Sequence, residues 1–302
     1  MILKAQSKWK WLIAAYLFLA GLGAGAYVTG VLADFRGAGW ETISKIGVCL
    51  GFPCVAAGCV FLLADLGTPK NFWRAGFRPN TSWIARGTII ITIFMVLGAV
   101  HVVFWLWPFN GLALSVGGRH TVGMAGVLFA FGTMIYTGIL LGASRPIAFW
   151  STAMLPLLFL VSALSTGLMA VILLACLGGV AHAGPVASLA RTDLVLIILE
   201  LFILGFYLQG THRVPESRAS AEVVLFGDSA ALFWWGVAVL GLVAPLALGL
   251  LNVFVLDGAA WIALVGSACG IAGGLFLRQV VLSGGIHAPL KVGRFEVGLP
   301  IV

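Results

Sequence analysis

The chain has 302 residues, of which 61% are hydrophobic and 9% are charged, and its mean hydropathy is +1.12. This composition excludes an ordinary soluble globular domain and indicates an integral membrane protein. The formal net charge of +7 does not indicate a nucleic-acid-binding protein, because the 17 Lys and Arg residues are spread over short segments instead of gathered on one face.

Eight apolar runs follow one another along the chain, and none of them alternates polar and apolar residues as a strand of a membrane barrel would. A helix needs about 20 mainly apolar residues to cross the hydrocarbon of a bilayer. We therefore predict one all-α integral membrane domain over residues 1–302, with eight transmembrane helices. The predicted spans are 11–33, 45–66, 85–107, 121–143, 149–179, 189–210, 229–255 and 259–282.

The first predicted span runs past an "AGA" tripeptide at 24–26 that is similar to a signal-peptidase site. The apolar run extends to Leu32, which is long enough to cross, so we expect an uncleaved first helix. Tyr16 lies early in this run, and Tyr136 lies near the same face at the end of the fourth. At that depth a tyrosine hydroxyl is either a hydrogen-bond donor in an apolar pocket or an interfacial anchor.

Charged residues surround the segment between the second and third predicted spans. Asp65 ends the second span and Arg86 opens the third. Between them, Pro69 and Pro79 are expected to bound a short amphipathic helix in the headgroup layer. Arg278, near the end of the eighth span, is expected at the same depth. Asp65, Arg86 and Arg278 then form a charge cluster, unless the two arginines only extend to the interface.

Histidines and cysteines are the candidate ligands of redox groups. A haem held by two histidines needs imidazoles at one depth on different helices. His101 is the one histidine inside a predicted span, and His182 is its best partner, which keeps a haem b-type membrane anchor as an alternative. The five cysteines lie in apolar runs without CxxC spacing. We therefore expect no haem and no iron–sulfur cluster in this chain.

Glycines recur at short spacing within two predicted spans, where they are expected to let helix backbones approach closely. Two prolines inside long predicted spans are expected to bend them. The glycines are Gly21, Gly23 and Gly25 in the first span and Gly270, Gly273 and Gly274 in the eighth, and the prolines are Pro156 and Pro245.

Glu200 is a carboxylic acid near the bilayer midplane, nine residues beyond Arg191 in the sixth predicted span. Ionisable residues at membrane depth are costly, so each is a candidate for function. Glu200 is either a proton relay or a hydrogen-bonding group that packs two helices. Asp193 and Arg191 are expected to form an interfacial pair in contact with water at the outer end of that helix.

The distribution of basic residues predicts the orientation. With eight spans, thirteen of the 17 Lys and Arg residues fall on one side, and only Arg36, Lys45, Arg119 and Arg191 on the other. Segments rich in Lys and Arg stay in the cytoplasm. Both termini are therefore expected to be cytoplasmic.

Five phrases, in order along the chain, resemble the NrfD/PsrC family, the membrane subunits of polysulfide reductase-type respiratory complexes. The combination D-L-G-x-P-x-x-F-W with R-P-x-x-S-W is the most specific part. The phrases are "WLIAAYLFLAGLGAGAY" (11–27), "LLADLGTPKNFWRAGFRPNTSWIARG" (62–87), "YTGILLGASRPIAFW" (136–150), "STGL" (165–168) and "LRQVVLSGG" (277–285).

The resemblance implies a subunit of the bacterial inner membrane with two four-helix bundles, which binds menaquinone or ubiquinone and no haem. It also implies a ferredoxin-like iron–sulfur partner and, through it, a molybdenum enzyme or a multihaem cytochrome that carries the main substrate site. Given the predicted orientation, that partner is expected in the cytoplasm.

The resemblance also assigns residues. Tyr136 aligns with a tyrosine that contacts the quinone, and Tyr16 stands where the family has a histidine. Because a tyrosine exchanges protons at neutral pH less readily than a histidine, proton transfer is expected to fall to Asp65, with Arg86 and Arg278 in the quinone pocket. Glu200 is expected to continue a proton route to the outer side. A secondary transporter is the other alternative, although the two halves show no repeat.

Overall fold

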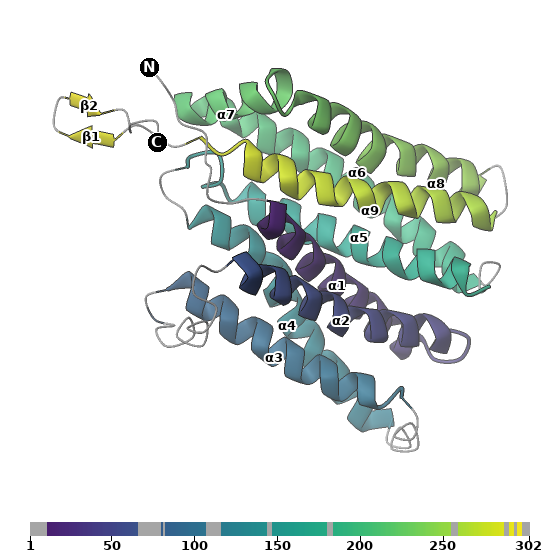
Figure 1. The fold of residues 1–302 in the computed structure, drawn as a ribbon. Coiled ribbons are helices and arrows are strands. Elements are labelled where there is room, and N and C mark those ends of the chain that lie inside the picture. The colour runs from purple at the N-terminus through teal and green to yellow at the C-terminus, as the bar shows by residue number, and fades with distance from the viewer. Residues whose placement is uncertain are drawn as a thin grey trace.

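The computed structural model describes residues 11–65, 80, 82–106, 116–143, 147–179, 184–254, 259–286, 290–292 and 295–297. These residues form a helical array with one short antiparallel hairpin (Figure 1). In chain order the elements are α1 (Trp11–Arg36), α2 (Glu41–Asp65), α3 (Trp83–Val103), α4 (Val116–Gly142), α5 (Met154–Leu177), α6 (Gly184–Gly210), η3 (Thr211–Arg213), α7 (Pro215–Phe226), η4 (Leu232–Val243), α8 (Ala244–Phe254), α9 (Ala260–Ser283), β1 (Leu290–Val292) and β2 (Phe295–Val297).

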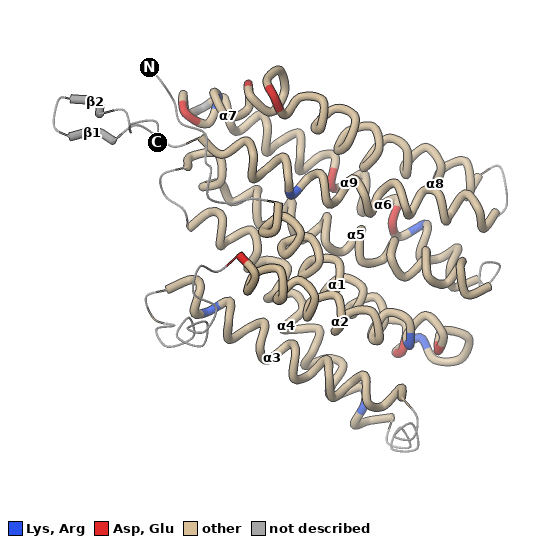
Figure 2. Tube along the Cα trace, viewed as in Figure 1, with Lys and Arg blue, Asp and Glu red and all other residues tan. Residues whose placement is uncertain are grey.

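Within the described ranges, seven helices are long and apolar enough to cross a membrane: α1 to α5, the continuous helix Leu232–Phe254, and α9. The predicted all-helical membrane class is confirmed. The sixth predicted span also coincides with a long helix, the 27 residues of α6, which carries Arg191, Asp193 and Glu200 within its length. Charged residues gather mainly at the ends of the helices, with few in the middle of the array (Figure 2).

The helices α1 and α5 occupy the centre of the array. The most apolar stretch of α1 is 83% buried and that of α5 is 72% buried. On one side, α1 packs against α2 and α4, and α3 covers α4. On the other side, α5 packs against α6 and α9, and α9 packs against η4 and α8 (Figure 1). Because α1 also packs along α5, the two sides share one continuous core.

Close glycine contacts bring the central helices together, as predicted. A Cβ at Gly23 would lie 2.7 Å from the Gly51 carbonyl oxygen of α2, and one at Gly25 would overlap the backbone of α5. A Cβ at Gly273 of α9 would overlap Gly241 of η4. These positions need glycine because another backbone occupies the place of the side chain.

Of the two prolines that were expected to bend long spans, Pro156 lies at the beginning of a helix and Pro245 lies inside the continuous helix Leu232–Phe254. Pro156 is in the first turn of α5, where its missing N–H would have had no helical partner. Pro245 is the second residue of α8, at the point where the wide π-helical turns of η4 change to α-helix. Since Pro245 cannot donate a hydrogen bond, the regular ladder is interrupted there.

Two parts of the fold differ from the predicted spans. The fifth helix begins at Met154, not at 149, and the preceding turn is buried under α9: the Trp150 indole Nε1 donates to the Val281 carbonyl at 2.7 Å. The prediction also lacks α7. That helix has only 12 residues and carries three charged side chains, among them the exposed ion pair of Arg218 and Glu222, so hydropathy alone did not reveal it.

Candidate functional site

Two buried tyrosines from different helices lie together in the first half of the array. Tyr16 of α1 is 1% exposed and Tyr136 of α4 is 6% exposed, and Tyr136 is one of the ionisable neighbours of Tyr16. The backbone of α3 closes over Tyr136, because a Cβ at Gly87 would overlap its ring. The structure therefore brings together the two tyrosines that the sequence singled out, between α1, α3 and α4.

Asp65 and Arg86 flank the loop between α2 and α3. Asp65 is the half-buried last residue of α2. Arg86 is exposed in the first turn of α3, where its guanidinium donates to the Asn80 carbonyl at 3.1 Å and lies over the Trp83 ring at 4.5 Å. The amphipathic helix predicted between residues 69 and 79 lies outside the described residues.

Arg278 lies deep between the helices instead of at their ends. It is 1% exposed, and its Nη1 donates to the Ser162 hydroxyl at 2.5 Å and to the Gly274 carbonyl at 3.0 Å. Its guanidinium also lies 5.3 Å from the centre of the Phe159 ring. A Cβ on Gly21 of α1 would be 3.5 Å from Nη2. Arg278 thus joins α5 and α9 beside α1, in surroundings different from those of the exposed Arg86.

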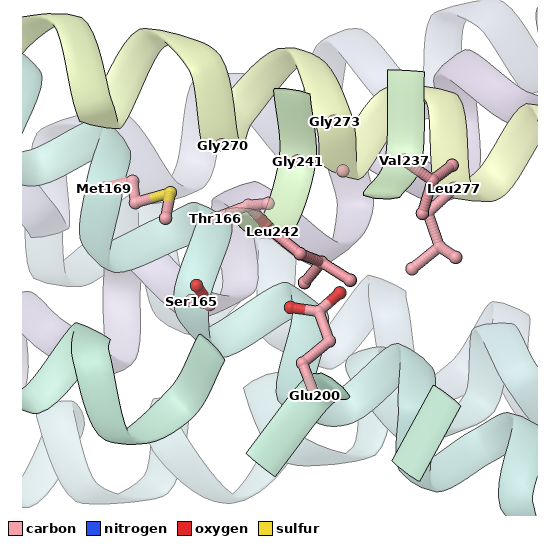
Figure 3. Close-up of a pocket in the computed structure, with 11 residues that line it drawn as sticks. Ser165, Thr166, Met169, Glu200, Val237, Gly241, Leu242, Gly270, Gly273 and Leu277 are labelled. Atoms are coloured by element: carbon pink, nitrogen blue, oxygen red, sulfur yellow. The ribbon is translucent and has the colours of Figure 1, made fainter. Parts of the chain in front are cut away.

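Glu200 is brought to Arg278 by the packing of α6 on α5. Its carboxylate is buried, with Ser162 and Arg278 among its polar neighbours. Figure 3 shows this carboxylate pointing into a cavity between α5, α6, η4 and α9, beside Ser165 and Leu242. The cavity has a volume of about 10 Å³, which is about the space that one water needs. The cavity is therefore suited to a proton carrier and far too small for a quinone ring.

Asp193 extends this cluster of polar side chains toward the N-terminal end of α6. It lies nine residues inside α6 and is 7% exposed, and its Oδ1 accepts a hydrogen bond from the Ser165 hydroxyl at 2.7 Å. The predicted interfacial pair with Arg191 is wrong, because Arg191 is exposed and Asp193 turns inward to α5. The helix begins at Gly184, earlier than predicted, and this places Asp193 below its first turns.

A second polar group, of which the sequence analysis singled out only His101, joins α1, α3 and α4. Tyr27 and His101 share a hydrogen bond of 2.8 Å between the hydroxyl and Nδ1. Further along α1, Asp34 accepts two hydrogen bonds from Arg119, at 2.6 and 2.8 Å. The sequence contained one sign of this group: Asp34 follows Tyr27 by two helical turns, so that both lie on one side of the helix. His182, which was considered as the second haem ligand beside His101, lies outside the described residues.

None of the described side chains forms a group of three or more His, Cys, Asp and Glu residues that could hold a metal ion. The clusters of polar side chains described above consist of hydroxyl, carboxylate and guanidinium groups. Such groups bind and move protons or position a polar ligand.

Comparison with known proteins gives a consistent result over nearly the whole chain. The sequence profile described as "Polysulphide reductase, NrfD" matches residues 3–289. One of the chains of polysulfide reductase from Wolinella succinogenes is 29% identical, covering 92% of this chain and 94% of that protein. Protein NrfD of Escherichia coli K12 is 28% identical with the same coverage. One of the subunits of selenate reductase from Mesobacillus selenatarsenatis is 25% identical, covering 82% of this chain and 67% of that protein.

Proposed function

This chain belongs to the polysulphide reductase NrfD family, and we propose that it is the quinone-reactive membrane subunit of a respiratory oxidoreductase complex in a bacterial inner membrane. The relatives that are named as single components of polysulfide and selenate reductases support a place beside other subunits. The proposed partner is a ferredoxin-like iron–sulfur subunit, which connects the quinone pool to a molybdenum enzyme or a multihaem cytochrome. The observation that carries the proposal is the pair of buried phenols, Tyr16 and Tyr136.

The proposed topology has eight membrane-spanning helices in two four-helix bundles. One bundle is α1 to α4, and the other is α5, α6, α9 and the helix formed by η4 and α8, in keeping with the packing of these helices. The excess of Lys and Arg on the side of the predicted termini supports cytoplasmic N- and C-termini. The phenol pair is then near the cytoplasmic face, and so is the iron–sulfur partner.

The two phenols fit a quinone head group. A phenol hydroxyl can donate a hydrogen bond to a quinone carbonyl oxygen. Leu17, Met134 and Leu141 belong to the same buried apolar cluster as the two tyrosines. A quinone bound there would supply two-electron, two-proton redox chemistry. Tyr16 and Tyr136 would orient its head group and keep water from it.

Asp65 is the proposed proton donor or acceptor at the entrance of this pocket. It ends α2 in a half-buried position, so that it can exchange protons with water, and Arg86 at the start of α3 would stabilise its carboxylate. Arg278 would connect the pocket to the second bundle, because its guanidinium lies beside Gly21, five residues after Tyr16 on α1.

Glu200 is the proposed carrier of protons deeper into the membrane. Ser162 and Arg278 are among its polar neighbours. The cavity is also lined by Ser165, whose hydroxyl donates to Asp193. Two carboxylates, two hydroxyls and room for one water make a series of groups that can exchange protons. The proposal is that this series lets quinone chemistry move protons across the membrane.

The test is the Tyr136→Phe variant of the complex in native membranes. The substitution removes one hydroxyl and leaves the ring, so we expect assembly of the complex to be unchanged and quinone turnover to fall. We also expect that quinone can be extracted from the unaltered complex. Tyr207→Phe is the matched control: its hydroxyl is also buried, but donates to the Phe149 carbonyl at 2.8 Å in the second bundle. Equal turnover in both variants and the unaltered complex would remove Tyr136 from the site.

A further inference from the structure

The first bundle contains a polar cluster that the proposed quinone chemistry does not use. It is made of Tyr27 and Asp34 of α1, His101 of α3, and Arg119 and His120 of α4, and we call it the outer cluster. Tyr27 and Asp34 are seven residues apart, so they lie on one side of α1. The cluster follows that side from the interior to the end of the helix at Arg36.

The inner end of the outer cluster is the hydrogen-bonded pair of Tyr27 and His101. Both residues are 0% exposed, and the ring of Phe94 meets Tyr27 edge to face at 5.2 Å. Two glycines of α4 make room for the pair: a Cβ at Gly126 would overlap the Tyr27 hydroxyl, and one at Gly123 would lie 3.1 Å from His101 Cε1. At 1.5 Å per residue, Tyr27 is about 14 Å from the end of α1.

The outer end of the outer cluster reaches the membrane face where α1 ends. Arg119 and His120 have side chains that are 16% and 28% exposed, and both approach Asp34, whose side chain is 4% exposed. The Arg119 guanidinium also lies 4.7 Å from the centre of the Trp105 ring, one helical turn beyond His101. Charged and polar groups therefore continue from the surface to the neighbourhood of the buried imidazole.

Two buried polar atoms along this line of groups lack hydrogen bonds. They are His101 Nε2 and Trp105 Nε1, each shielded from solvent and without a hydrogen-bond partner among the described residues. Leaving such atoms unsatisfied in a low-dielectric interior is costly. Ordered water satisfies groups of this kind, since one buried water makes two to four hydrogen bonds.

From these observations we propose that the outer cluster is a water-filled half-channel, through which protons from the face where α1 ends reach His101. His101 exchanges protons at Nε2 with the line of water molecules. While it holds the proton, the Nδ1–H donates to the Tyr27 oxygen, which fixes the ring. Asp34 and His120 pass protons between the surface and the water, and Arg119 keeps the Asp34 carboxylate in place.

The first experiment measures contact of His101 with water and needs no turnover. In solid-state NMR of the complex containing ¹⁵N-histidine, magnetisation is transferred from water to the imidazole nitrogens, and the His101→Gln variant identifies the His101 signal. We expect transfer to His101 Nε2 comparable to that of the exposed His212. Gly123→Ala should reduce it severalfold by narrowing the space, whereas Gly117→Ala, with no atom within 4 Å of the new Cβ, should not. Absence of transfer to His101 would overturn the proposal.

The second experiment asks whether redox-linked protons use the half-channel, and this step rests on the proposed function. In proteoliposomes with the complex, protons appearing at the Arg119 face per quinol turned over should fall severalfold in His101→Gln and Tyr27→Phe. Turnover with a protonophore should stay unchanged. An unaltered proton yield in both variants would overturn the role of the half-channel in redox-linked proton movement. Lack of any quinone turnover would instead remove the proposed function and leave the water contact of His101 to be decided by NMR.

Discussion

Replacement of Asp34 by Asn tests the strength of the ion pair between α1 and α4. The Asp34 side chain is 4% exposed and that of Arg119 is 16% exposed, and two hydrogen bonds of 2.6 and 2.8 Å join them. Asn keeps the size of the side chain but removes its charge. The Arg119 guanidinium is then buried without a counter-charge, which typically costs about 3–5 kcal/mol of unfolding free energy.

A double-mutant cycle with Arg119 measures how strongly the two side chains are coupled. Arg119→Met removes the guanidinium and its contact with the Trp105 ring at 4.7 Å, and leaves Asp34 as the uncompensated charge. Because Arg119 retains some exposure, we expect Asp34→Asn to cost about 3 kcal/mol, at the low end of that range. The double variant buries no lone charge, so its cost should fall below the sum of the two by about 1–3 kcal/mol.

The assay is reversible unfolding in mixed micelles by increasing detergent mole fraction, followed by the helical circular dichroism signal. The control is Arg218→Met, which breaks an exposed ion pair with Glu222 on α7 and should cost less than about 1 kcal/mol. Single variants at Asp34 and Arg119 that cost no more than this control, with strictly additive effects, would refute the argument that the pair is buried and coupled.

Three further predictions follow from close contacts. Gly87→Ala should lower quinone turnover strongly, because the new Cβ must displace the Tyr136 ring; turnover in membranes measures it. Gly273→Ala should destabilise the second bundle by about 1–3 kcal/mol, since its Cβ meets the Gly241 backbone; the same unfolding assay measures it. Trp150→Phe should cost about 1–3 kcal/mol, because a buried carbonyl of α9 loses its donor at 2.7 Å.

Matched substitutions separate these effects from general damage. Gly117→Ala, on α4 with open space around it, should leave turnover and stability unchanged. Trp235→Phe, at a residue 72% exposed, should cost much less than Trp150→Phe. If Gly87→Ala and Gly117→Ala have the same turnover, the packing of α3 against Tyr136 does not shape the pocket.

The predicted spans overlap the long observed helices because membrane insertion depends on local composition. A run of about 20 apolar residues must be helical in lipid, where each backbone polar group needs an internal partner. The same reasoning fails at helix ends and for α7, since neither depends on mean hydropathy. Trp150 is an example. Its hydropathy predicts the start of a span, but the residue lies in a turn and its indole donates to a carbonyl 131 residues away.

Candidate residues could be recognised from the sequence, but their partners could not. Glu200 and Arg278 stand out as charges in apolar runs. Which neighbour they meet depends on the rotation of each helix about its axis, and this is set by the packing of small residues such as Gly25 and Gly274. Arg278 therefore binds Ser162 on α5 instead of joining a cluster at the helix ends.

By itself the sequence determined that this chain is a helical membrane protein of the NrfD family, and which rare polar residues its long apolar segments carry. Only the tertiary structure decided that Tyr16 lies near Tyr136, that Asp193 turns inward to Ser165, and that Tyr27 pairs with His101. The physical reason is that hydropathy is a sum over neighbouring residues in one segment. A hydrogen bond between helices depends on two side chains far apart in the sequence, and on the backbones that bring them within 3 Å.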